Sequence, residues 1–184
     1  SQMAESKGLD TLAEAFVLLR GRGGFDDVRL RVFGGATEAD EPLVRRVRKS
    51  LADAGLAAAA EFAEDFHPDR KPAFLQSCSA VAVPTRQGEA FGYFVLESLA
   101  CGVPVVLPAH GAFPELVAAT GGGLLHEPGS AQDLADKLAE LLADPARAAE
   151  LGRAGRAAVL EHYTAPAMAR KVERLCEGLM GVER

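Results

Sequence analysis

Hydrophobic positions along the chain follow two alternating patterns, one with helical spacing and one of short continuous or alternating runs. Helical spacing is found in residues 9–19, 40–54, 72–77, 91–101, 130–142 and, after one further helix, 164–180. The short runs that predict strands are residues 28–33, 58–62, 80–83, 103–107 and 124–125. Glycine or proline follows most of these segments, which is typical of element ends. The chain therefore predicts strands and helices that alternate.

This alternation predicts an α/β fold with a Rossmann-like, doubly wound parallel sheet. Residues 80–83 and 103–107 are almost wholly apolar, as expected of parallel strands that are covered on both faces. Ligands of such sheets lie outside the carboxyl ends of the strands. The loops after Phe33, Val83 and Leu107 are therefore the candidate binding loops.

Length and composition fit one domain, residues 1–184, with 48% hydrophobic and 25% charged residues. A net charge of −6 argues against binding nucleic acid through its phosphates. Cys78, Cys101 and Cys176 lie far apart without zinc spacing, so we expect no metal site and three reduced, buried thiols. No signal sequence or membrane-spanning run is evident, and we expect a cytoplasmic protein.

The loop after Val83 carries the candidate chemistry. It leads through Gly92 into a helix whose first N–H groups, at Gly92, Tyr93 and Phe94, form an anion site together with the helix dipole. Glu89 precedes this helix, and Glu97 lies one turn beyond Tyr93 on the same face. Carboxylates repel an anion but accept hydrogen bonds from vicinal diols. A ligand with a diol, a diphosphate and a second diol satisfies all three features, and a nucleotide-sugar has this layout.

Residues 89–97, Glu-Ala-Phe-Gly-Tyr-Phe-Val-Leu-Glu, resemble the E-x7-E motif of retaining GT-B glycosyltransferases of the family-four type. Four further segments resemble that family in the same order along the chain. They are the Lys-Gly start at residues 7–9, the A-x-G-x-P-V-V segment at 100–106, the glycine–glutamate loop at 111–115, and residues 122–125 leading to Pro128 and Gly129. The resemblance covers essentially the whole chain and implies the C-terminal half of a GT-B fold.

The resemblance also implies roles for individual residues. Glu89, as a catalytic residue, would hold the donor sugar's hydroxyls, and Glu97 the ribose diol. Lys7, the second catalytic residue, would bind the diphosphate with the amides of residues 91–94 and stabilise it as it departs. The implied substrate-binding residues are Gln2, Phe91, Gly92, Tyr93, Phe94 and Glu97. The family uses no metal or other cofactor, and retention would proceed on one sugar face, with the leaving phosphate helping to deprotonate the acceptor.

Two positions depart from the family pattern. Gln2 stands where the family usually has a second phosphate-binding arginine, and Arg86 is a candidate substitute. Glu64 or Asp65 stands where many relatives have glycine, in the region that usually holds the base. The loss of the arginine motivates one alternative, a degenerate nucleotide-sugar-binding module without catalysis. A second alternative is a GT-B epimerase that acts on nucleotide-sugars without transfer.

Other interpretations of single residues stay open. Glu97 is also compatible with an exposed helix position, Lys7 with a surface lysine, Phe91 with core packing, and Glu115 with a helix cap. The four histidines are scattered, so a hydrolytic triad is unsupported. A glycosidase pair is also unsupported, because a helix-borne glutamate beside the dipole has no reason for a raised pKa.

The resemblance implies that the chain is the donor-binding half of a two-domain enzyme and is inactive alone. The acceptor-binding N-terminal domain would be its partner, and membrane association would depend on that domain. Met168, Val172, Leu175 and Leu179 of the last helix are expected to face inward, and this helix would cross back to the other domain. Lys7 should follow a central strand, and a sheet lacking that strand would have a gap in its middle. We therefore expect either upstream residues or an adapted sheet.

Overall fold

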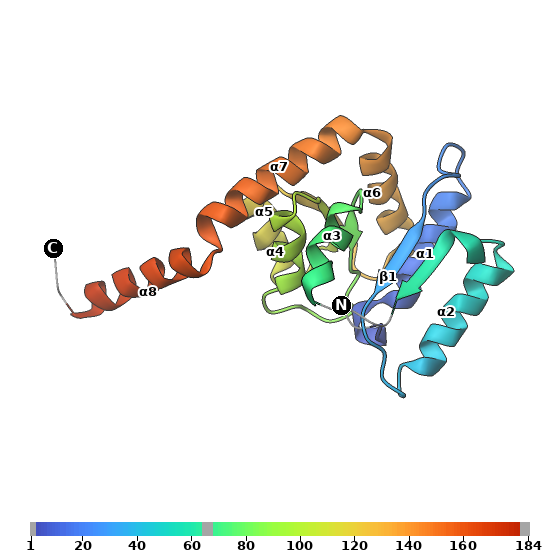
Figure 1. Ribbon diagram of the computed structural model, residues 1–184, viewed down its shortest axis with the longest axis horizontal. Helices are drawn as coiled ribbons and strands as arrows, with labels where there is room; N and C mark the ends of the chain where they lie inside the picture. The colour runs from blue at the N-terminus through green and yellow to red at the C-terminus, as the bar shows by residue number, and fades with distance from the viewer. Residues whose placement is uncertain (1–2, 64–67, 181–184) are drawn as a thin grey trace.

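The computed structural model describes residues 3–63 and 68–180. Its helices are α1 (Leu9–Arg20), α2 (Glu41–Asp53), α3 (Lys71–Gln76), α4 (Tyr93–Ala100), α5 (Phe113–Thr120), α6 (Ala131–Ala143), α7 (Pro145–His162) and α8 (Ala165–Met180), with short 3-10 turns η1 (Glu5–Lys7), η2 (Ala57–Ala59) and η3 (Pro68–Arg70). Its strands are β1 (Leu30–Phe33), β2 (Ala60–Ala63), β3 (Val81–Ala82), β4 (Val105–Pro108) and β5 (Gly123–His126). Strands and helices alternate as predicted (Figure 1).

All strand pairs in the described residues are parallel, and the strands form two sheets, β1–β2 and β3–β4–β5. Leu30 lies opposite Ala60 in the first sheet, and Val105 opposite Gly123 in the second. The predicted α/β class and parallel sheet are confirmed. Differences lie at the element ends: β3 comprises only two residues, and the strand predicted at 58–62 begins at Ala60 because a 3-10 turn precedes it.

Helices cover both faces of the larger sheet. Val105 and Leu107 of β4 pack with α4, α5 and α7, whereas Val106 packs with α1 and α6 on the opposite face. Successive side chains of a strand point to opposite faces, so a fully buried β4 needs cover on both. This double cover explains why the strand sequence is continuously apolar. It also leaves the strand ends as the exposed parts of the sheet.

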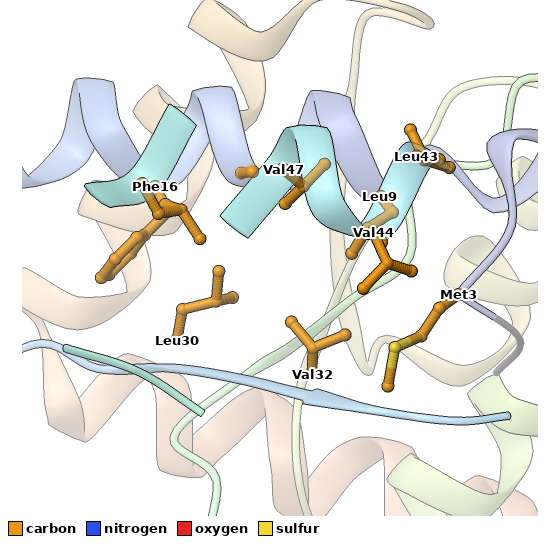
Figure 2. Packing of buried hydrophobic residues seen from close by; sticks show 10 residues of the cluster. Met3, Leu9, Phe16, Leu30, Val32, Leu43, Val44 and Val47 are labelled. Atoms are coloured by element: carbon orange, nitrogen blue, oxygen red, sulfur yellow. The ribbon is translucent and has the colours of Figure 1, made fainter. Parts of the chain in front are cut away.

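A separate hydrophobic cluster joins α1 and α2 to β1 (Figure 2). Phe16 of α1 and Val47 of α2 converge on Leu30 and Val32, which share one face of β1. Met3, only 1% exposed, fills the end of this cluster. The opposite side of α1 contributes Ala15 and Leu19 to the cluster with α6. Helix α1 therefore packs against both halves of the molecule.

A gap separates the two sheets. One edge of β1 and one edge of β3 have no strand partner within the described residues. Between them lies an open cavity of about 810 Å³, lined by residues 28–35 and 77–84 together with parts of the surrounding helices. Residues 3–8 cross its carboxyl end, where Met3 N–H donates to Gly35 O at 3.0 Å and Arg86 N–H donates to Ser6 O at 2.9 Å. This is the gap expected in the middle of the sheet.

Helix α8 corrects one expectation. Met168, Val172, Leu175 and Leu179 were expected to face inward, but they are 53–80% exposed. The helix projects away from the body beyond α7 (Figure 1), so its apolar face meets no layer formed by residues 3–63 or 68–180. The amphipathic spacing predicts the helix itself correctly. It does not determine whether a partner for the apolar face lies within the same chain.

The cysteines are only partly as expected. All three are free thiols, but Cys176 on α8 is exposed, and Cys78 and Cys101 are half-buried. Burial raises the pKa of the Cys78 and Cys101 thiols, which makes them less reactive at neutral pH. Across the described ranges, no three His, Cys, Asp or Glu side chains gather as metal ligands. No helix there combines the length and apolarity needed to cross a membrane.

Candidate functional site

The candidate site lies where β3 ends and α4 begins. Gly92 caps α4 with a left-handed backbone, φ +75°, and its carbonyl accepts a hydrogen bond from Val95 N–H at 2.9 Å. A Cβ at this position would lie 3.0 Å from Phe113 Cε1, so the position favours glycine for both backbone and space. The amides at the start of α4 have no carbonyl one turn earlier in the helix. Gly92 itself is buried, so the glycine allows the start of α4 to pack closely against Phe113.

Lys7 and Glu89 meet at this site although 82 positions separate them in the sequence. Lys7 Nζ donates to Glu89 Oε2 at 2.8 Å, and the side chains are 28% and 26% exposed. Lys7 is carried by η1, which ends at Gly8 with φ +70°. A Cβ on Gly8 would lie 2.0 Å from Pro84 O, so the absence of a side chain allows η1 to approach the loop after β3. The fold thus brings together the two residues predicted to be catalytic.

The loop before α5 holds the main chain of Glu89. Ala112 N–H donates to Glu89 O at 3.0 Å. Gly111, with φ +59°, approaches so closely that a Cβ would lie 2.7 Å from Glu89 N and 2.8 Å from Glu89 O. The segment that resembles the family's glycine–glutamate loop therefore packs against the main chain of Glu89 and fixes its position. Glu115, in the first turn of α5, is exposed and lies at the helix end where a carboxylate is favourable.

Glu97 is 41% exposed on α4 and forms an ion pair with Lys71, the first residue of α3. The amino group of Lys71 donates to Glu97 Oε2. Sequence reasoning missed Lys71. Its pairing with Glu97 depends on how α3 packs beside α4, and nothing in the residues around Lys71 signals this in one sequence. Both glutamates of the E-x7-E segment are therefore paired with a lysine from another element.

The aromatic residues at the start of α4 divide into two groups. Phe91 and Tyr93 are 39% and 70% exposed, with ring centroids 4.8 Å apart. Phe94 packs inward, edge-to-face with Phe113 at 5.8 Å. Phe91 is therefore not a core residue, and its ring and that of Tyr93 are available at the surface beside the anion site. The rings of Phe91 and Tyr93 are thus placed to contact a ligand, whereas the Phe94 ring is half-buried against Phe113 and lines the cavity between the sheets.

Arg86 does not offer a free positive charge to the site. Its guanidinium donates to Glu5 Oε1 at 2.9 Å and to Asp10 Oδ2 at 2.5 Å, so two carboxylates compensate one cation. This weakens the hypothesis that Arg86 replaces the arginine missing at Gln2. Gln2, Glu64 and Asp65 lie outside the described residues.

Two histidines lie at the carboxyl ends of the neighbouring strands. His110 Nε2 is 2.8 Å from Thr85 O, to which it donates. His126, at the end of β5, is 1% exposed, and its Nδ1 donates to Glu127 O at 2.8 Å. Burial lowers the pKa of His126, so the ring is neutral at pH 7. Both contacts are to main-chain carbonyl oxygens.

The fold and this site define a class of protein. The sequence profile described as "Glycosyl transferases group 1" matches residues 1–158, and the chain belongs to that family. A solved C-terminal domain of a glycosyl transferase group 1 family protein (LpcC) from Francisella tularensis superposes with a TM-score of 0.79 at 26% identity, over 88% of this chain and 82% of that one. The C-terminal half of a GT-B fold, expected from the sequence, is thus confirmed.

Individual relatives are longer than this chain. It is 32% identical, over 97% of its length, to a GDP-mannose-dependent alpha-(1-6)-phosphatidylinositol monomannoside mannosyltransferase of Mycobacterium tuberculosis. It also resembles the structure of sucrose-phosphate synthase from Thermosynechococcus elongatus, with a TM-score of 0.83, 26% identity and full coverage of this chain. The chain spans 46% of the first relative and 45% of the second, about half of each.

Proposed function

We propose that this chain is the donor-binding domain of a retaining, metal-independent glycosyltransferase that moves a sugar from a nucleotide-sugar to an acceptor hydroxyl. The observation that carries the proposal is the Lys7–Glu89 ion pair beside the start of α4, with Glu97 farther along the same helix. This order supplies a carboxylate, a cation with free amides, and a second carboxylate. It matches the sugar hydroxyls, diphosphate and ribose diol of a nucleotide-sugar. The name of the mycobacterial relative, which includes GDP-mannose, supports this ligand class.

The proposed chemistry divides between the residues of the site. Lys7 and the α4 amides stabilise the diphosphate as the bond between its oxygen and the anomeric carbon breaks. Glu89 accepts hydrogen bonds from the sugar hydroxyls, and Glu97 accepts them from the ribose. The acceptor oxygen forms the new bond on the face that the diphosphate leaves, and its proton passes to a phosphate oxygen. No step requires a metal ion or another cofactor.

The acceptor site belongs, in this proposal, to an N-terminal domain that faces the carboxyl ends of the strands. Residues 1–184 then form one nucleotide-sugar-binding domain of a cytoplasmic enzyme, and any membrane contact belongs to the partner domain. The exposed apolar face of α8 supports such a neighbour, because Met168, Val172, Leu175 and Leu179 are amphipathically arranged and uncovered in the described chain. We expect the isolated 184 residues to bind the donor and not to turn it over.

Thermal unfolding with UDP, GDP, ADP and a nucleotide-sugar of each tests the proposal. A nucleotide at 100 times its Kd adds about 2.7 kcal/mol, which raises Tm by about 5–11 °C in a domain of this size. Lys7→Ala should weaken diphosphate binding by about 10–100-fold, because a charge-assisted hydrogen bond contributes about 1.5–3 kcal/mol. Lys137→Ala is the matched control, since Lys137 pairs with Glu140 on α6, away from the site.

Several results would contradict the proposal. Absence of any Tm shift with the nucleotide panel would contradict the proposed donor site. Loss of nucleotide binding in EDTA would contradict metal independence. Sugar transfer by the 184 residues with added acceptor would show that they are not merely a half-site. Equal losses in Lys7→Ala and Lys137→Ala would show that Lys7 does not contact the diphosphate.

A degenerate binding module is the second candidate, favoured by Gln2 and by the compensated charge of Arg86. Gln2→Arg in the full-length protein separates the two functions. A large gain in the transfer rate supports the degenerate binding module, whereas an unchanged rate supports an enzyme that does not need the arginine. Formation of an epimerised sugar-nucleotide from donor alone would instead identify an epimerase.

A further inference from the structure

Lys71 links α3 to the helix that carries the E-x7-E segment. It is the first residue of α3 and follows directly on the 3-10 turn η3, which carries Asp69. The Lys71 ammonium donates to Glu97 Oε2 of α4.

This ion pair has a geometry that leaves Glu97 able to bind a ligand. The Lys71 ammonium donates to Glu97 Oε2, and the Glu97 side chain is 41% exposed. An ionised carboxylate offers about four lone-pair sites, so one ammonium leaves enough for two hydroxyl donors. The pair is too exposed to be explained as core structure, with Lys71 itself 31% exposed and lining the same cavity as Lys7.

The two ion pairs differ in their place relative to the anion site. The Lys7 pair lies at the anion site itself, whereas Lys71 reaches Glu97 from a separate helix. Lys71 is therefore suited to act through Glu97 rather than on the phosphates.

We propose that Lys71 is a positioning residue for ribose recognition: it fixes the Glu97 carboxylate toward the ribose diol. This inference rests on the proposed donor site. It predicts that Lys71 matters for a nucleotide with both ribose hydroxyls and not for one that lacks them. A purely structural link between α3 and α4 would affect both nucleotides equally.

Calorimetry on the 184-residue chain provides the test, with the nucleoside diphosphate that gives the largest Tm shift and its 2′,3′-dideoxy analogue. Lys71→Met should weaken binding of the ribonucleotide by about tenfold, the effect of losing about one hydrogen bond to a charged group. Binding of the dideoxy analogue should change less than about twofold. Lys71→Arg, which keeps the positive charge, should retain the ribonucleotide affinity of the unmodified chain. In Glu97→Gln, adding Lys71→Met should cause little further loss, because the two residues act as a unit.

Lys49→Met is the matched control, since Lys49 forms an exposed ion pair with Asp53 on α2. It should leave both affinities unchanged, and unliganded Tm values show that each variant is folded. Equal losses for both nucleotides in Lys71→Met, or no loss for either, would overturn the inference while the donor site stands. If the unmodified chain binds no nucleotide, the donor site and the role of Lys71 both fail.

Discussion

Gly111 offers a direct test of how the fold positions Glu89. Its φ of +59° lies in the left-handed region, which costs any other residue about 1–2 kcal/mol. An alanine Cβ there would lie 2.7 Å from Glu89 N, whereas ordinary contact begins near 3.4 Å. The Glu89 segment in Gly111→Ala must therefore move by about 0.7 Å, the difference between the two distances.

Gly121, at the other end of α5, is the matched control. Its φ of +61° imposes the same backbone strain, but an added Cβ would meet only Ala154 Cβ, at 3.8 Å. Gly121→Ala should therefore lower the free energy of unfolding by about 1–2 kcal/mol. Gly111→Ala should lower it by about 1–3 kcal/mol more, the usual cost of forcing atoms into occupied space. Urea unfolding of the two variants measures this difference.

Binding separates the functional effect from the loss of stability. Moving Glu89 disturbs its proposed hydrogen bonds to the sugar hydroxyls, and a hydrogen bond to a charged group contributes about 1.5–3 kcal/mol, so Gly111→Ala should weaken nucleotide-sugar binding about tenfold. Its affinity for the bare nucleoside diphosphate should change less, because Glu89 is assigned to the sugar. Calorimetry with both ligands at 15 °C keeps the variants folded. If Gly111→Ala and Gly121→Ala match in stability and in the ratio of the two affinities, the reasoning about Glu89 is refuted.

Three further predictions concern stability. Gly152→Ala on α7 places a Cβ 2.1 Å from Gly102 O and should cost about 3 kcal/mol in urea unfolding, and a loss below 1 kcal/mol would contradict this contact. Thr85 Oγ1 is buried without a hydrogen-bond partner in the described structure, so Thr85→Val should be neutral or stabilising by up to about 1 kcal/mol. Thr120→Val removes a 2.7 Å hydrogen bond to a main-chain carbonyl and should cost about 1–2 kcal/mol. Equal changes in the free energy of unfolding would refute this difference between the two threonines. Burial holds the pKa of His126 below its ordinary 6.5, so only the unfolded chain takes up this proton as pH falls below about 6.5, and stability should fall with it. His126→Gln should flatten the dependence of Tm on pH between pH 7.5 and 5.5. An unchanged slope would exclude His126 as its cause.

The local sequence pattern was sufficient to predict most of the helices and strands and the loop that carries the candidate site. The apolar run in β4 and the capping Ser130 of α6, whose Oγ accepts from Asp133 N–H at 3.1 Å, are encoded in neighbouring residues. Lys7 and Glu89 could be paired only through their resemblance to a family, because no spacing rule relates residues 82 positions apart.

Other features depend on three-dimensional packing that a single sequence does not reveal. The Lys71–Glu97 pair follows from the placement of α3, and the compensation of Arg86 by Glu5 and Asp10 follows from where η1 lies. The orientation of α8 was mispredicted for a related reason. Periodicity specifies which residues share a face, but the neighbour of that face is decided by the rest of the protein.

The gap between the sheets has a consequence for how this chain behaves in solution. The cavity-facing edges of β1 and β3 present rows of main-chain donors and acceptors without a strand partner in residues 3–63 and 68–180. Open strand edges are templates for pairing with other chains. The 184 residues should therefore self-associate as concentration rises, and main-chain amides at these two edges should exchange with deuterium faster than those between β4 and β5. An extended peptide that occupied the gap would join five short strands into one continuous sheet and would suppress both effects.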